Sequence, residues 1–318
     1  MKFLIAAPEF DENSGGKIAL HRLCHLINTC VDEHDAFLVR MGKGITRMAI
    51  LADALHPRLF AQRIARQYRT HPSWNTPFAE TISDLEDCIA IYPEIASGNP
   101  IGAPRVIRWF LHHPGFFTGR ANYGKGEIYF RHRSWVTPFI VNGSRMSPQI
   151  LRAFYFPSET YNTDGAIVRD LECCHMIRKG THKAHIHPPR SILLDGKTHT
   201  EIARIFKRSK RFISYDDYTA YSKLAACSGC ESIVAPTPNT TPEQWRPSVE
   251  DRYGIAYGTS PDQLEWARKT QTIAKDTLHQ EEMDSTESVR RCLAEAVEYF
   301  NDRDINSNPI ATPKKSSI

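Results

Sequence analysis

The chain has 318 residues, with 40 lysines and arginines against 36 aspartates and glutamates, so its formal charge is +4. This surplus is too small to indicate a nucleic-acid partner, although it leaves room for local basic clusters. At about 150 residues per domain the length predicts two domains, and a chain of this size folds without disulfides.

The first residues do not have the pattern of a secretory signal, because the apolar run over residues 3–7 ends at Pro8. No stretch approaches the roughly 18 consecutive apolar residues of a membrane span. The eight cysteines lie mostly in apolar segments, as reduced core thiols do. We therefore expect a cytoplasmic protein.

The first half of the chain begins in the order of a doubly wound α/β sheet. An apolar run over residues 2–7 predicts a strand, and a polar loop leads from it to Gly15 and Gly16, where apolar residues at helical spacing begin. Further strands are expected over residues 36–39, 88–92, 106–111 and 135–141. In such a sheet the glycine loop lies at the carboxyl end of the first strand.

Residues 44–69 combine helical apolar spacing with a one-sided charge. The segment contains a single acidic residue, Asp53, and five arginines, namely Arg47, Arg58, Arg63, Arg66 and Arg69. A helix of this kind can lie on an anionic membrane or attract a phosphorylated glycan. The alternative is an ordinary solvated helix face. The first interpretation predicts peripheral contact with the inner face of the membrane.

A second α/β unit begins near residue 165. Strands are expected over residues 173–178, 191–194, 211–215 and 232–235, and helices over 198–208, 218–226, 261–278 and 285–300. Thr198 and Glu201 form a capping-box pattern. The predicted domains are residues 1–164 and 165–280, followed by a helix over 281–303 that can pack on the first domain and a disordered tail over 304–318.

Two turns of this second unit carry the sharpest signals. One contains Arg178, Lys179 and Gly180, and a planar fork beside a mobile charge suits a diphosphate. The other contains Asp216, Asp217, Tyr218, Thr219 and Ala220, where a helix is expected to open and to offer amides to a phosphate. Both turns follow strands, and open α/β sheets bind ligands at the carboxyl ends of strands. The ordinary alternatives are a helix cap and a solvated basic turn.

These motifs resemble the donor half of bacterial GT-B glycosyltransferases of lipopolysaccharide and capsule synthesis. The similarity is carried by Arg178-Lys179-Gly180 and by the run from Tyr215 to Cys230, Tyr-Asp-x-Tyr-Thr-Ala followed by Ala-Ala-Cys-x-Gly-Cys. Gly15-Gly16 is similar to the acceptor-side glycine loop of that superfamily, and residues 92–94, 109–115 and 253–258 resemble other segments of it. The resemblance extends from about residue 3 to about residue 270.

The resemblance implies two Rossmann-like domains, with a nucleotide-sugar donor on the second and a glycan or lipid-linked acceptor on the first. By position, Arg178 and Lys179 would contact the diphosphate, and Thr219 with the amides of residues 218–220 would cap it, without a cofactor or an essential metal. Many retaining members carry two glutamates, eight positions apart, in this region. Here the matching positions hold Tyr215 or Asp216 and then Lys223. Whether the transfer retains or inverts the anomeric centre therefore stays open.

An inverting transfer also needs a base that takes the acceptor proton. The candidates follow strands of the first half, and they are Glu9, Asp11, Glu94, His112 and His113. Each of them has the alternative of an ordinary loop hydrogen bond or cap.

Other signals are weaker. His182, His185 and His187 lack a local carboxylate or thiolate partner, so no metal site is expected, and Cys227 and Cys230 are interpreted as packing residues. A nucleotide-sugar epimerase of the same architecture and a non-catalytic nucleotide- or carbohydrate-binding protein remain alternatives. A Rossmann dehydrogenase is disfavoured, because no G-x-G-x-x-G follows the first strand.

Overall fold

The computed structural model describes residues 1–41, 68–79, 84–165 and 168–307. Contacts divide the chain into two compact units. Unit 1 consists of Met1–Pro8, Leu23–Arg152 and Thr286–Ile318, and unit 2 consists of Glu9–Arg22 and Ala153–Ser285. The Arg-rich segment lies outside the described residues except for Tyr68 and Arg69, as does the tail beyond residue 307.

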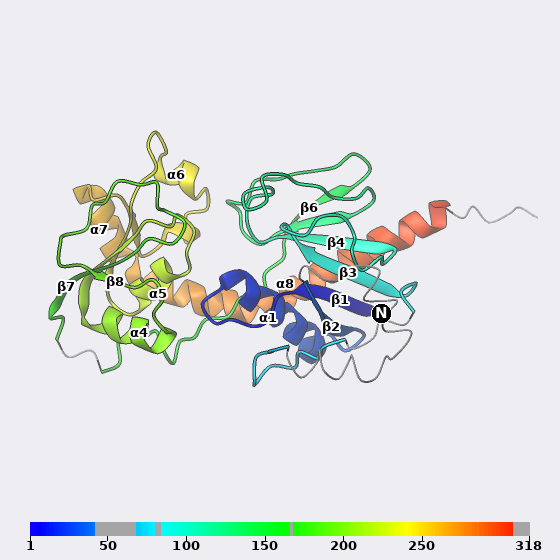
Figure 1. Cartoon of the computed structure of the whole chain (residues 1–318), viewed down its shortest axis with the longest axis horizontal. Helices are drawn as coiled ribbons and strands as arrows, with labels where there is room; N and C mark the ends of the chain where they lie inside the picture. Colours follow the sequence, from blue (N-terminus) through cyan, green and yellow to red (C-terminus); the bar gives the residue numbers. More distant parts are fainter. Residues whose placement is uncertain (42–67, 80–83, 166–167, 308–318) are drawn as a thin grey trace, which may run out of the picture. The chain divides into compact units, whose positions relative to one another are not determined.

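Unit 1 is built on a six-stranded parallel sheet in the order β2-β1-β3-β4-β5-β6 (Figure 1). The strands are β1 (Lys2–Ala7), β2 (Asp35–Arg40), β3 (Cys88–Pro93), β4 (Arg105–Phe110), β5 (Ile128–Arg131) and β6 (Arg145–Ile150). All six residues of β3 are buried, as in a central strand of a parallel sheet that is covered on both faces. Helix α1 (Gly15–Cys30) follows β1, and Leu23 and Ile27 on it are fully buried.

The strands expected over residues 2–7, 36–39, 88–92 and 106–111 are confirmed, but the one expected over 135–141 is wrong. That segment is a loop whose Trp135, Phe139 and Val141 pack against a buried cluster around Phe110 and Tyr129. Its apolar residues therefore cover the core without strand pairing. The last strand is β6, whose Pro148 and polar residues suit the edge of a sheet.

Unit 2 is built on a five-stranded parallel sheet in the order β11-β10-β9-β7-β8 (Figure 1). The strands are β7 (Leu171–Met176), β8 (Ile192–Leu193), β9 (Ser209–Ser214), β10 (Glu231–Val234) and β11 (Ile255–Tyr257). Its helices are α4 (His199–Arg208), α5 (Tyr221–Cys227), α6 (Pro242–Trp245) and α7 (Pro261–Lys269), and a 3-10 turn spans Glu250–Arg252. The α/β class is confirmed, and the two sheets are compatible with two Rossmann-like domains.

Helices cover both faces of the unit 2 sheet because side chains alternate along its strands. Phe212 faces α4 and α5 in one buried cluster, and Ile213 faces α7 in another. The predicted capping box starts α4, where the Thr198 hydroxyl accepts from the Glu201 amide and the Glu201 carboxylate accepts from the Thr198 amide.

The end of the chain forms one long helix, α8 (Gln271–Ser307). The break expected after residue 278 is absent, and the break between α7 and α8 lies at Thr270, whose hydroxyl accepts from the Gly254 amide. The helix also continues through residues 304–307, where a disordered tail was expected to begin. Within unit 1, Ser147 donates to Glu295 of α8 over 2.6 Å. Among the described residues, no helix has the length and apolar character needed to cross a membrane.

Both sheets follow one topological rule. In unit 1 the chain goes from β1 to β2 on one side and then to β3 on the other, so the strand order reverses between β1 and β3. In unit 2 it goes from β7 to β8 and then to β9, so the order reverses between β7 and β9. Ligands of open α/β sheets bind beyond the carboxyl ends of the strands at such a switch point.

Candidate functional site

The switch point of unit 2 brings the two predicted turns together. The turn after β7, residues 177–180 (the Arg178 turn), lies against the turn after β9. A Cβ on Gly180 would lie 2.1 Å from the Tyr215 carbonyl oxygen, so only glycine fits at this position. The Lys179 ammonium is 3.8 Å from the Asp216 carboxylate. The convergence of the two turns, expected from sequence, is therefore present.

Asp195, which the sequence analysis missed, holds the Arg178 turn. Its two carboxylate oxygens accept from the amides of Ile177, at 2.8 Å, and Arg178, at 2.9 Å. Arg178 has a φ of +42°, a left-handed conformation that is costly for a residue with a Cβ. Such strain persists where the surroundings impose it, and Asp195 supplies that constraint. The sequence shows only an aspartate two residues after a short strand and just before Gly196, a pattern too common to single it out.

The Arg178 side chain is exposed and oriented by two contacts within unit 2. Its Nη2 donates to the Asn13 carbonyl over 2.9 Å, and its guanidinium carbon lies 5.6 Å from the centre of the Tyr221 ring. The Tyr221 hydroxyl donates in turn to the Asn13 side chain, and burial raises the pKa of Tyr221 to about 12. In the part of the chain that the structure describes, no carboxylate lies within ion-pair distance of Arg178.

The carboxylate and the carbonyl of Asp217 are both engaged in contacts within the fold. Its carboxylate is 2.6 Å from the ammonium of Lys183, which also donates to the Ala235 carbonyl and is almost fully buried. The Asp217 carbonyl accepts from Trp245 Nε1 and from Arg246. Asp217 thus ties the turn after β9 to the loops that follow β10.

The remaining residues of this turn bond to one another. The Asp216 carboxylate accepts from the Tyr218 amide, and the hydroxyl of buried Thr219 accepts from the Tyr221 amide. Helix α5 begins only at Tyr221, after Ala220, without a side-chain cap. The helix opening expected at residues 217–219 is therefore wrong, because Asp216 forms an Asx-type turn that competes with the first helical turn.

A cluster of histidines lies behind the turn, around buried Tyr215. The Tyr215 hydroxyl accepts from the Ile186 and His187 amides, so its own hydrogen points to His187 Nδ1, at 2.7 Å. The His187 ring stacks on His175 at 3.7 Å. Burial, with the His187 ring beside it, lowers the pKa of His175 to about 4. Among the described residues, no three potential ligands gather in a way that could hold a metal ion.

Three of the candidate bases share the carboxyl edge of the unit 1 sheet. Glu94 directly follows β3 and is buried, and its carboxylate accepts from the Leu111 amide over 3.0 Å. His112 and His113 follow β4, and His113 Nδ1 accepts from the Thr137 amide over 3.1 Å. Burial lowers the pKa of His113, which favours its neutral form.

The other two candidate bases belong to unit 2. Glu9 lies at the start of its first segment, and the Asp11 carboxylate is 3.1 Å from the Lys17 ammonium and accepts from the Asn13 amide. Gly15 and Gly16 form the exposed first turn of α1. A Cβ on Gly15 would meet nothing within 4 Å, so close approach does not require glycine there.

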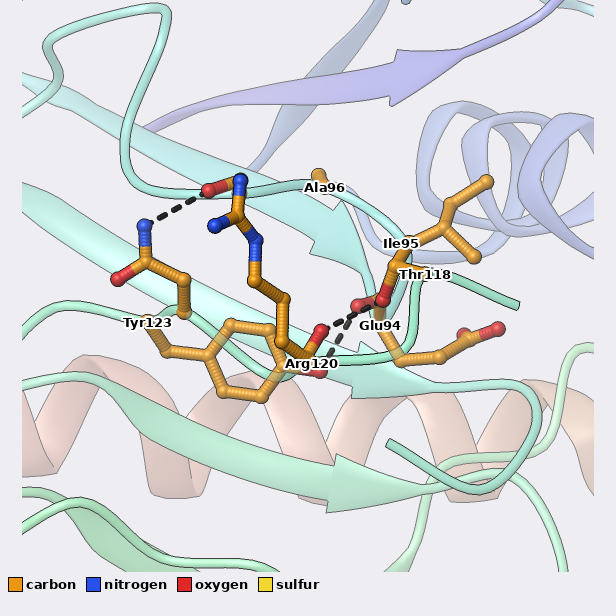
Figure 2. A pocket seen from close by; sticks show the side chains of 8 residues that line it. Glu94, Ile95, Ala96, Thr118, Arg120 and Tyr123 are labelled. Atoms are coloured by element: carbon orange, nitrogen blue, oxygen red, sulfur yellow. Dashed lines mark hydrogen bonds between the residues drawn. The ribbon is translucent and has the colours of Figure 1, made fainter. Parts of the chain in front are cut away.

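A pocket of about 310 Å³ opens beside Glu94 in unit 1 (Figure 2). Its lining comes from the loop after β3 and from the segment between β4 and β5, and it includes Ser97, Thr118, Arg120, Asn122 and Tyr123. Of the lining residues only Glu94 was expected from the sequence, because the two segments approach each other only in the fold.

No model of a known protein family matches the chain, and no curated protein matches its sequence.

Proposed function

We propose that the protein is a glycosyltransferase of the GT-B type, which transfers a sugar from a nucleotide-sugar donor to a bacterial surface glycan or a lipid-linked acceptor. The observation that supports it best is the Arg178 turn at the switch point of unit 2. Two exposed cations stand there on a backbone that Asp195 holds in a strained conformation. Cationic turns at switch points suit anionic groups such as a diphosphate.

The turn would act on the departing nucleotide. As the glycosidic bond of the donor breaks, negative charge grows on the diphosphate, and Arg178 and Lys179 would stabilise it through preorganised charge. Arg178 keeps this geometry through Asn13 and Tyr221, which contact its side chain before any ligand arrives. In this proposal the positive charge comes from side chains, and no metal is required.

The proton of the acceptor hydroxyl needs a base if the transfer inverts the anomeric centre. Glu94 and His113 are our candidates, because both lie at the carboxyl edge of the unit 1 sheet. Glu94 offers a buried carboxylate. His113 offers a ring whose neutral form is favoured because burial lowers its pKa, and its Nδ1 would take the proton after releasing the Thr137 amide. A base must be in its unprotonated form at the working pH, and the lowered pKa of His113 favours that form.

Titration calorimetry with nucleoside diphosphates and nucleotide sugars tests the donor site. We expect the double variant Arg178→Ala, Lys179→Ala to weaken binding by at least about tenfold, because two charge-assisted contacts disappear. Arg204→Ala with Lys210→Ala is the matched control, since it removes two exposed cations elsewhere in unit 2. Equal affinity of the double variant and the wild type would refute the donor site.

Product analysis separates glycosyl transfer from the alternatives. An epimerase would convert a nucleotide sugar without any acceptor, and a binding protein would bind it without turnover. At Lys223, where many retaining members have a glutamate, the ammonium donates to the Glu250 and Tyr253 carbonyls. The missing glutamate is the reason for retaining the non-catalytic binding protein as an alternative.

The arginines of residues 44–69 support the further proposal of contact with anionic lipid. Liposome co-sedimentation of an Arg58→Glu, Arg63→Glu, Arg66→Glu variant tests it.

A further inference from the structure

The unit 1 pocket is a built cavity. Its two walls, residues 94–98 and residues 118–123, are joined by three hydrogen bonds. The Gly98 amide donates to the Asn122 carbonyl at 2.8 Å, the Asn122 side chain donates to the Ser97 hydroxyl at 2.9 Å, and the Tyr123 hydroxyl donates to the Glu94 carbonyl at 2.7 Å. The pocket therefore exists before a ligand binds.

A buried ion pair holds the first wall, residues 94–98, in place. Arg108 is fully buried, pairs with Glu127 at 2.7 Å, and donates to the carbonyls of Ala96 and Gly98, both at 2.9 Å. The Tyr92 and Tyr123 rings lie within 5.0 Å of its guanidinium carbon. These contacts use the guanidinium of Arg108 inside the fold, so its charge is not offered to a ligand.

The second wall places another guanidinium at the pocket. The loop over residues 113–120 closes on itself, since the Gly119 amide donates to the Gly115 carbonyl and the Thr118 hydroxyl donates to the Arg120 carbonyl. In Figure 2 the side chains of Arg120 and Glu94 extend toward opposite ends of the pocket. Within the described ranges, no carboxylate forms an ion pair with Arg120. The pocket thus has a cationic end and an acidic end.

The same loop exposes apolar surface. Phe116 and Phe117 are 55% and 52% exposed although both rings contact His112. The two rings do not line the pocket itself, but they give the same loop an apolar outer face.

We propose that this pocket binds an anionic sugar, a pyranose ring that carries a carboxylate or phosphate group, with Arg120 at the anionic group. The planar fork of arginine matches carboxylate and phosphate geometry. Ser97, Thr118 and Asn122 supply the hydroxyl and amide groups that recognise ring hydroxyls, and the volume suits a ligand of this size. Naming the ligand as a sugar rests on the proposed function, in which it would be part of the acceptor.

Saturation-transfer NMR with D-glucuronate, D-glucose 6-phosphate and D-glucose tests this assignment on the full chain. The Arg178→Ala, Lys179→Ala variant serves as background, so that the unit 2 turn contributes no cation. We expect both anionic sugars to bind about tenfold more tightly than glucose, because a charge-assisted fork adds roughly 1.4 kcal/mol or more. Arg120→Gln is expected to reduce their binding to the level of glucose.

Lys125→Gln is the control, because it removes an exposed cation of unit 1 that does not line the pocket. Unchanged binding in the Lys125 variant and loss in the Arg120 variant would support the assignment. Equal binding of glucose and the anionic sugars, no effect of Arg120→Gln, or equal competition by inorganic phosphate would overturn it. None of these readouts involves the nucleotide. Failure of the anionic-sugar assignment would therefore leave the donor-site test unaffected.

Discussion

The two units share a strand order but differ in the chemistry at the switch point. The unit 2 order is reproduced by the first five strands of unit 1, and β6 is added only in unit 1. In unit 2 the switch point carries the exposed pair Arg178 and Lys179, whereas in unit 1 it carries the buried carboxylate of Glu94. The shared topology places both candidate sites at the carboxyl edge of their sheets, and the loop residues give the two sites different chemistry.

The units also differ in how their edges are held in place. Unit 1 uses a fully buried cation, Arg108, to hold the loop after β3 from inside. Unit 2 uses a carboxylate, Asp195, to hold the turn after β7 through two amides. Removing one member of a buried ion pair destabilises the whole fold, whereas losing an amide-bound carboxylate releases a local backbone conformation. Substitutions in the two units should therefore have different effects.

Arg108→Ala should have the largest effect on the free energy of unfolding. It leaves Glu127 buried without its partner, a loss of about 3–5 kcal/mol. Urea denaturation at pH 7 measures it. The control is Arg208→Ala, because its ion pair with Asp170 is exposed to solvent and should contribute little to stability. Equal losses in the two variants would remove the structural role assigned to Arg108.

Gly180→Ala should have a smaller effect on stability but a local one on the donor site. The added methyl would overlap the Tyr215 carbonyl, and such overpacking costs about 1–3 kcal/mol. Because the two turns must then separate, nucleotide affinity should fall as well. Gly15→Ala is the matched control, since its methyl meets nothing, and in a helix it should stabilise the fold by about 0.4–1 kcal/mol. A neutral Gly180→Ala would contradict the close contact.

The last expected effect is a pH dependence of stability that belongs to unit 2. The pKa of folded His175 is about 4, below its ordinary value near 6.5, so on acidification the unfolded chain binds the proton first. The folded state should therefore lose stability as the pH falls from about 6.5 to about 4. His175→Gln should flatten this part of the curve of melting temperature against pH. The control is exposed His182→Gln, and a curve that both variants leave unchanged would contradict this cause.

Much of the local structure was predictable from residues close in sequence. The strands over residues 2–7, 88–92 and 106–111 were read from short apolar runs, and the start of α4 from Thr198 and Glu201. The errors have local causes as well. Residues 135–141 form an apolar loop, and the turn at Asp216 delays α5 to Tyr221.

The candidate sites were predictable only in part. Sequence placed Arg178, Lys179 and Asp216 after strands, because such turns are visible as breaks between apolar runs. It did not find Asp195 or Arg120, because an aspartate after a strand and an arginine in a loop have no distinctive local pattern. It also treated Asp217 like Asp216, although Lys183 binds only Asp217 in the buried pair.

The sequence by itself determined the α/β class, most of the strands and the positions of the two turns, because periodicity and capping depend on neighbouring residues. The tertiary structure alone decided which residues hold each turn and which charged side chains already have a partner within the fold. It packs Gly180 against Tyr215, pairs Lys183 with Asp217, and connects residues 97–98 to Asn122 through hydrogen bonds. These partners lie far apart in the chain, and only the order of the strands brings them within hydrogen-bonding distance.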